Sequence, residues 1–214
     1  MSDLSLPLNI LALIAVIGVL RFKYVRRKRQ IDERAAFIRS YVFAPSMLQS
    51  VKAHHPTLTD EDLQVVTEGL RVFFLVRLHT GNTLMGMPSK VVDDLWHEFI
   101  LHTQDYQTFC QRAFGAFFHH IPAQATRSGA NIQYGMRATF QQACVEEHIS
   151  LVAPERLPLL FAIDEKLAIV NGNRYTTQQL ALKQQDVGAG VACGGGSSCG
   201  GHSCGGHGGS CGGH

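Results

Sequence analysis

Residues 84–122 read LMGMPSKVVDDLWHEFILHTQDYQTFCQRAFGAFFHHIP, and this stretch holds the most informative side chains of the chain. Ser89 is suited to cap a helix that runs to His102. At about 100° per residue, one face of that helix is apolar and is expected to be buried. The face carries Val92, Leu95, Trp96 and Phe99. The stretch therefore predicts helices that pack on a common core.

Helical spacing of apolar residues continues on both sides of this stretch. Further helices are expected over 31–42, from Pro45 to before Pro56, from a Thr59 cap to Gly81, over 106–114, and from Ser128 through Cys144. Asn171-Gly172 separates residues 168–170 from 174–176, a pattern typical of a two-residue hairpin turn. With 214 residues, 45% of them hydrophobic, the chain can fill an interior. We predict a mainly α protein: a compact helical domain with one small β-hairpin.

The N-terminal segment, residues 4–20, reads LSLPLNILALIAVIGVL and carries no charge. Six basic residues follow it within positions 21–29. A cleaved signal peptide has its positive charges before the apolar run, and a buried soluble helix does not end in such a basic cluster. The pattern predicts a single transmembrane helix in the inner or plasma membrane, with the lipid bilayer as its partner. By the positive-inside rule, the N-terminus is expected outside and the rest of the chain in the cytoplasm.

Charge argues against nucleic acid as a partner. The chain has 19 Lys and Arg against 17 Asp and Glu, and removing residues 1–29 leaves 13 basic against 16 acidic side chains. No basic stripe then remains for a phosphate backbone. We expect three regions: residues 1–29 as a membrane anchor with its basic flank, 30–186 as the helical domain, and 187–214 as a disordered tail rich in Gly, Cys and His.

A set of metal-ligand side chains lies in the central stretch. Asp93 and His97 are four residues apart and share one flank of the predicted helix. Cys110, His119 and His120 follow, close enough in sequence to fold back onto that flank. Histidine, cysteine and carboxylate together suit zinc or another borderline metal. The alternative, which we favour at this point, is that the aromatic residues and Cys110 form the core and the histidines hydrogen-bond to helix ends.

Three motifs in this region resemble a family of uncharacterised bacterial proteins. They are GLRVFF at 69–74, MPSKVVDDLWHEFILHT at 87–103 and YQTFCQRAFGAFFHHIP at 106–122. The Trp-His pair followed by Tyr-x-x-x-Cys is also similar to the plant glycine-rich domain proteins. The resemblance covers roughly residues 30–176. It implies a small helical domain, often beside glycine-rich sequence, and it implies no particular reaction.

The final segment contains four units that begin with Cys-Gly-Gly, and three of these place a His three residues after the Cys. The seven candidate ligands are Cys193, Cys199, His202, Cys204, His207, Cys211 and His214. Thiolates and imidazoles are the ligands that zinc, nickel and copper(I) prefer. In a reducing compartment the thiols would stay free of disulfides. The tail is therefore expected to bind a soft metal with modest affinity, because it loses conformational freedom on binding.

These features lead to three hypotheses about function. The first is a membrane-anchored binding module that faces the cytoplasm and whose tail captures a metal ion. The second is a scaffold that binds an unidentified protein partner, with the tail as a tether. The third is a metal-dependent enzyme that uses the Asp93, His97, Cys110 and His119 or His120 side chains. Phosphate-binding loops, the zincin helix and the serine-hydrolase elbow are absent from the sequence, so we favour a non-enzyme.

Overall fold

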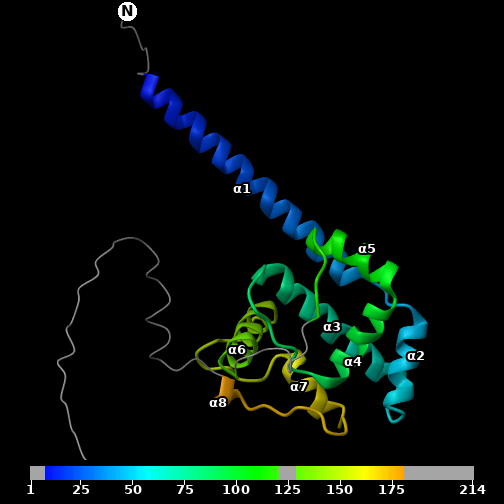
Figure 1. The fold of residues 1–214 in the computed structure, drawn as a ribbon. Coiled ribbons are helices and arrows are strands. Elements are labelled where there is room, and N and C mark those ends of the chain that lie inside the picture. Colours follow the sequence, from blue (N-terminus) through cyan, green and yellow to red (C-terminus); the bar gives the residue numbers. More distant parts are fainter. Residues whose placement is uncertain (1–7, 121–128, 181–214) are drawn as a thin grey trace, which may run out of the picture. The chain divides into compact units, whose positions relative to one another are not determined.

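The computed structural model describes residues 8–120 and 129–180, and within these ranges every regular element is a helix. The helices are α1 (Leu8–Ser40), α2 (Pro45–His54), α3 (Asp60–Thr80), α4 (Lys90–Leu101), α5 (Thr103–Phe114), α6 (Gly129–Glu146), α7 (Leu159–Lys166) and α8 (Thr177–Leu180) (Figure 1). The mainly α prediction is confirmed. The chain divides between Ala181 and Leu182, and the predicted tail, residues 187–214 with its seven ligands, lies outside the described residues.

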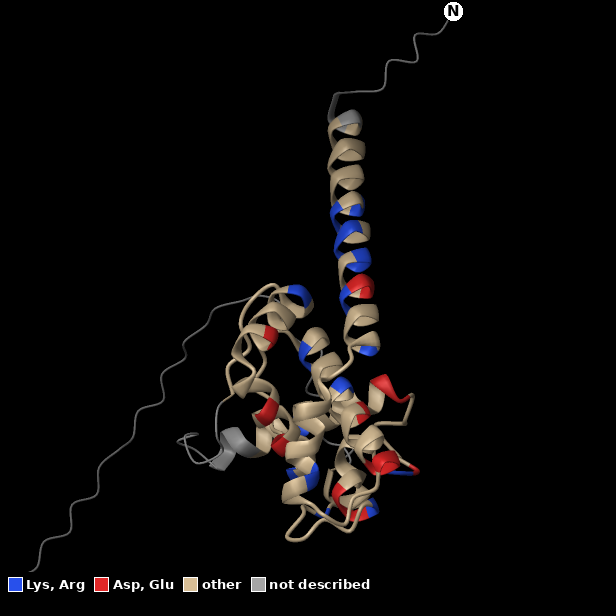
Figure 2. Cartoon of the chain, turned by 90° about the vertical axis from the view of Figure 1, so that its right-hand side faces the viewer, with Lys and Arg blue, Asp and Glu red and all other residues tan. Residues whose placement is uncertain are grey.

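Helix α1 corrects the predicted membrane anchor. Among the described residues, no helix is both long enough and apolar enough to cross a membrane. The charge-free part of α1 is residues 8–20, thirteen positions against the roughly 20 that a bilayer core needs, and Arg21 begins a basic run. Figure 2 shows these Lys and Arg positions in blue along the middle of α1. The prediction of a single-pass membrane protein is therefore wrong, and the orientation inferred from it, with the N-terminus outside and the domain in the cytoplasm, no longer has a basis.

Residues 168–176 correct the predicted β-hairpin. The turn exists, because the Gly172 N–H donates to the Ile169 carbonyl at 3.0 Å and Asn171 has a φ of 55°. The flanking segments do not pair as strands. Instead, the Asn173 backbone N–H donates to an Asp164 carboxylate oxygen at 2.8 Å, and the Tyr175 hydroxyl donates to the Pro88 carbonyl at 3.1 Å. The hairpin prediction is wrong, and the Asn173 backbone N–H, which a ladder could use, is taken by the Asp164 carboxylate.

Helix α3 lies at the centre of the packing and contacts α1, α4, α6 and α7. It begins where the sequence predicted, since Thr59 and Asp62 form a reciprocal capping box: the Thr59 hydroxyl accepts from the Asp62 N–H at 3.1 Å, and the Asp62 carboxylate accepts from the Thr59 N–H at 2.9 Å. The hydrogen bonds from Thr59 lower the pKa of Asp62. The cap thus fixes where the central helix starts.

The aromatic core joins α3, α4 and α5 to the end of α1. Phe74 lies against Phe109 with ring centroids 4.8 Å apart, and Phe109 in turn contacts Tyr41 at 4.8 Å. The predicted buried face of α4 is confirmed: Val92, Leu95, Trp96 and Phe99 are all buried. Burying this face turns the opposite flank of α4, which carries Asp93 and His97, toward the surface.

The start of α4 is held by a buried carboxylate from α7. Asp164 accepts hydrogen bonds from the Ser89 hydroxyl at 2.7 Å and from the Lys90 N–H at 2.8 Å. Ser89 also caps α4, as predicted, by accepting from the Val92 N–H at 3.2 Å. Helix α7 itself was not expected from the sequence. Its carboxylate fixes the register of the helix that carries two of the candidate ligands.

Candidate metal centre

Three of the predicted ligand residues converge on one flank of α4. Asp93 and His97 come from the helix, and His120 comes from the segment that follows α5. One candidate ligand atom from each of the three lies within 4.8 Å of the others. The His97 and His120 rings have centroids 4.4 Å apart. A turn of helix and a chain segment 23 residues downstream therefore bring two imidazoles and one carboxylate to the same place.

His97 is oriented by its own helix. Its Nδ1 lies 2.8 Å from the backbone carbonyl oxygen of Asp93. Because a carbonyl only accepts hydrogen bonds, this contact assigns the ring proton to Nδ1 and leaves the lone pair on Nε2. Metal-binding histidines commonly donate their second ring nitrogen to a backbone carbonyl in this way. The side chain is 51% exposed.

His120 is more enclosed and faces Asp93 directly. Its side chain is 15% exposed, and its Nε2 lies 3.1 Å from Asp93 Oδ1. Two ligands of one tetrahedral zinc ion, each bonded at about 2.0–2.1 Å, lie about 3.3 Å apart. The observed separation is close to that value. An ion can therefore replace the proton that the imidazole and the carboxylate share, with little movement of either side chain.

The segment that carries His120 is pinned along its length. Gly115 ends α5 with a φ of 77°, a conformation that favours glycine. Beyond it, the Phe118 ring stacks on Trp96 with centroids 5.0 Å apart, and the Arg77 guanidinium lies 4.7 Å over the Phe118 ring. The His120 ring then meets Trp96 edge-on at 4.5 Å. These contacts place His120 against α4.

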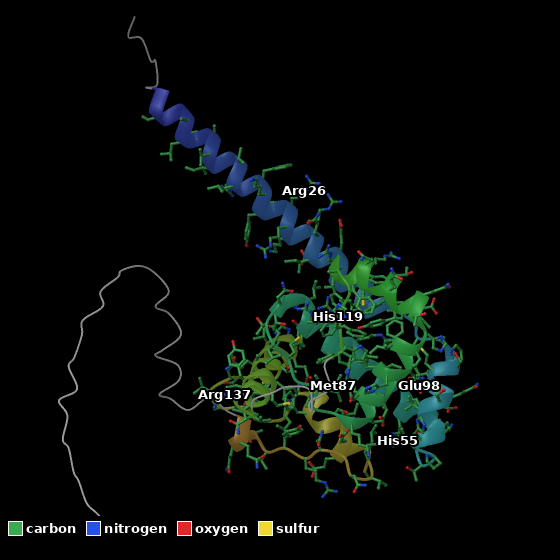
Figure 3. All side chains as sticks on the ribbon, viewed as in Figure 1. Arg26, His55, Met87, Glu98, His119 and Arg137 are labelled. Atoms are coloured by element: carbon green, nitrogen blue, oxygen red, sulfur yellow. The ribbon has the colours of Figure 1, made fainter. Side chains whose placement is uncertain are left out.

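Two of the predicted ligands lie outside this group. Cys110 is fully buried on α5, where burial raises the pKa of its thiol. His119 is exposed and packs on Phe117 with centroids 4.8 Å apart (Figure 3). Adjacent residues of an extended segment point in opposite directions, so only one of the two neighbouring histidines can face Asp93. The structure thus places Asp93, His97 and His120 together, apart from Cys110 and His119.

A second histidine–carboxylate pair escaped the sequence reasoning. His55 Nε2, at the end of α2, lies 2.7 Å from a carboxylate oxygen of Asp94 on α4. His55 and His119 lie on different parts of the domain (Figure 3). The pair ties α2 to α4. No spacing rule points to it, because 39 residues separate the partners and neither lies on a helix face shared with the other.

The donor set determines which metals suit the site. Two imidazole nitrogens and one carboxylate oxygen are typical of zinc sites with an open fourth position, and they also suit nickel. Copper(I) favours sulfur ligands, which this group lacks. Three protein ligands would leave a tetrahedral ion one coordination position for water or another ligand.

Comparison with known proteins identifies the family of the chain. No curated protein and no solved structure matches it. The model of the UCP032817-like family matches residues 33–202, a range that starts within α1 and includes Asp93, His97 and His120. The chain therefore belongs to the UCP032817-like family.

Proposed function

We propose that the helical domain is a metal-binding module that holds a zinc-class divalent ion through Asp93, His97 and His120. The observation that carries this proposal is the convergence of the three side chains from two separate segments, with their ligand atoms within 4.8 Å of one another. A histidine with a purely structural role needs only one hydrogen-bond partner. Here, His97 and His120 both lie beside the carboxylate of Asp93, although water could serve as a partner for an exposed ring such as that of His97.

The surroundings of the three side chains support the same proposal. The Nδ1 hydrogen bond of His97 holds its ring in the tautomer that a metal needs. The Trp96 ring packs edge-on against the His120 ring and stacks on Phe118. Apolar neighbours of this kind lower the local dielectric and strengthen electrostatic attraction to a cation. The ligands are thus oriented before a metal binds, which reduces the cost of binding.

The tail extends this proposal, since its four cysteines and three histidines form a second, softer ligand set. We propose that the tail captures zinc, nickel or copper(I) and that the domain site holds zinc or nickel. The metal-dependent enzyme remains an alternative, now confined to the open position beside Asp93, His97 and His120. The scaffold with an unidentified protein partner and the likeness to plant glycine-rich domain proteins stay predictions.

The test uses the full-length chain with the tail ligands removed. Serine replaces each tail cysteine and asparagine replaces each tail histidine, at 193, 199, 202, 204, 207, 211 and 214. Zinc binding to this chain is measured by calorimetry. Nickel binding is followed by quenching of Trp96, the single tryptophan, whose ring lies 4.5 Å from that of His120. We expect one ion per chain for each metal.

His120→Asn in this background removes a ligand, and His119→Asn is the matched control next to it. We expect His120→Asn to weaken zinc binding by more than the roughly 10–100-fold that loss of an outer-shell partner costs, and His119→Asn to leave it unchanged. Equal affinities of the two variants, or no binding by the tail-substituted chain, would contradict the proposal.

A further inference from the structure

We propose that the contact between Tyr106 and Phe118 positions His120 for metal binding. This inference rests on the proposed metal site and concerns residues that do not themselves bind the ion. Tyr106 lies on α5 and is almost completely buried. Its hydroxyl group donates a short hydrogen bond to the backbone carbonyl of Phe118 and accepts one from the Trp96 indole N–H at 3.2 Å.

The two partners of this hydroxyl lie next to the two histidine ligands in the chain. Trp96 immediately precedes His97, and Phe118 lies two residues before His120. One oxygen atom therefore links the helix that carries Asp93 and His97 to the segment that carries His120. Along the chain, helix α5 separates the two halves of the site, and this hydroxyl group is one of the contacts that bring them together.

Two further contacts of the Phe118 ring support the same arrangement. It stacks on Trp96 at an interplanar angle of 23°, and the Arg77 guanidinium lies over it at 4.7 Å from the ring centroid. Cation–π and stacking contacts of this kind fix the orientation of a ring. With the ring and the carbonyl of Phe118 both held, the chain has only one residue left before it reaches His120.

Removing the Tyr106 hydroxyl should loosen this segment without dismantling the core. Tyr106→Phe keeps the ring contacts and deletes one oxygen, so the Phe118 carbonyl and the Trp96 N–H each lose a partner. The His120 segment then samples positions in which Nε2 lies farther from Asp93. Metal binding must restore the productive position, and the cost of doing so appears as weaker affinity.

Tyr175→Phe is the matched control. Tyr175 is partly buried, and burial raises the pKa of its hydroxyl group to about 12. Like Tyr106, it donates a hydrogen bond to a backbone carbonyl, that of Pro88 at 3.1 Å. It contacts Pro88, which precedes α4, and the Phe161 ring of α7. If both variants lose stability, the cause is the hydrogen bond that each has lost. If only Tyr106→Phe loses zinc affinity, the cause is the loss of the correct position of His120.

The experiment measures zinc affinity by calorimetry in the full-length, tail-substituted chain, at a temperature well below unfolding. We expect Tyr106→Phe to weaken zinc binding about tenfold and Tyr175→Phe to leave it unchanged, since outer-shell partners of metal ligands typically contribute 10–100-fold. The visible absorption of the cobalt(II)-saturated protein provides a second readout. Its band shape is expected to change in Tyr106→Phe and to match the parent in Tyr175→Phe.

Phe118→Leu provides a variant that keeps the hydrogen-bonded backbone and removes the stacked ring, in case Tyr106→Phe does not fold by circular dichroism. It is also expected to weaken zinc binding about tenfold. Unchanged affinity in a folded Tyr106→Phe, or in Phe118→Leu if the first variant does not fold, overturns the positioning proposal. If His120→Asn weakens binding in the same series while these variants do not, the metal site stands and the positioning proposal alone fails.

Discussion

Asp164 is only 2% exposed and accepts hydrogen bonds from two elements besides its own helix. Its donors are the Ser89 hydroxyl and the Lys90 and Val91 N–H groups at the start of α4, and the Asn173 N–H in the following turn. A carboxylate at a helix N-terminus also interacts favourably with the helix dipole. This single side chain joins α7, α4 and the 169–173 turn, and it sets the register of Asp93.

Asp164→Ala is therefore expected to destabilise the protein strongly. It leaves buried donors without partners, and hydrogen bonds to charged groups contribute about 1.5–3 kcal/mol each to stability. We expect a loss of about 3 kcal/mol in the free energy of unfolding, measured by urea denaturation. Glu165→Ala, at the exposed neighbouring position of α7, is the control and should change stability by less than about 0.5 kcal/mol. Similar losses in the two variants would show that Asp164 does not hold α4.

The buried thiols give a prediction about alkaline pH. Burial raises the pKa of Cys144 from about 9 to about 11, and it also raises that of Cys110. Groups whose pKa is raised on folding contribute stability below their unfolded pKa, and this contribution disappears as the pH rises through the folded pKa. In the tail-substituted chain, the free energy of unfolding should fall between pH 9 and pH 11.

Thiol reagents at pH 8 should leave Cys144 unmodified until urea unfolds the chain. Rapid labelling of the native protein would contradict the burial of this thiol.

At the scale of elements, caps and apolar spacing explain which helices the sequence predicts. Thr59 and Ser89 each accept a backbone N–H at the helix start where the sequence placed them. The 31–42 segment continues α1 as expected, although the helix ends at Ser40. Helix α7 begins after Pro158 without a side-chain cap and spans only eight residues. It lacks the local signals that the longer helices carry, and its place depends on contacts with α3 and α4.

The crossing of α3 over α4 and α7 depends on Gly69. A Cβ atom at this position would lie 2.9 Å from Val92 Cγ2 and 3.2 Å from Ile163 Cδ1, both on fully buried side chains. Glycine thus lets the three helices approach closely. Alanine has a better helix propensity by about 1 kcal/mol, and overpacking a dense core costs typically 1–3 kcal/mol.

Gly69→Ala is expected to lower the free energy of unfolding by about 1 kcal/mol, because the steric cost exceeds the gain in helix propensity. Gly18→Ala in α1 is the control, since nothing lies within 4 Å of a Cβ atom there. That change should be neutral or slightly stabilising. Both are measured by thermal or urea denaturation. An increase in stability for Gly69→Ala would show that α3 and α4 pack less tightly than the structure indicates.

At the scale of the whole molecule, the candidate site combines what a sequence can predict with what only a fold supplies. The spacing of Asp93 and His97 places them on one flank of a helix, and the return of the His119-His120 pair to that flank was expected. The sequence could not predict which of the two histidines faces Asp93, because that depends on the direction in which Phe118 packs. Cys110 lies apart from these three side chains, because it is buried in the core that α5 forms with its neighbours.

The membrane and hairpin predictions were wrong for the same reason: local sequence patterns do not reveal contacts with distant parts of the chain. The sequence of residues 4–20 resembles that of a transmembrane segment. The described helix, however, continues through the basic residues from Arg21 and is buried in the domain at Ala35 and Ile38. Asn171-Gly172 forms its turn, yet a buried carboxylate from α7 takes the N–H that follows. Local patterns identified the helix and the turn, whereas their partners come from distant parts of the chain.

The most direct test of the metal site is X-ray absorption at the zinc edge on the zinc-loaded, tail-substituted full-length chain. We expect a shell of nitrogen and oxygen ligands at about 2.0–2.1 Å with the outer scattering of two imidazoles, falling to one imidazole in His120→Asn. A sulfur ligand at about 2.3 Å, which would have to come from Cys110 or Cys144, would contradict it. So would an imidazole signal that His120→Asn leaves unchanged.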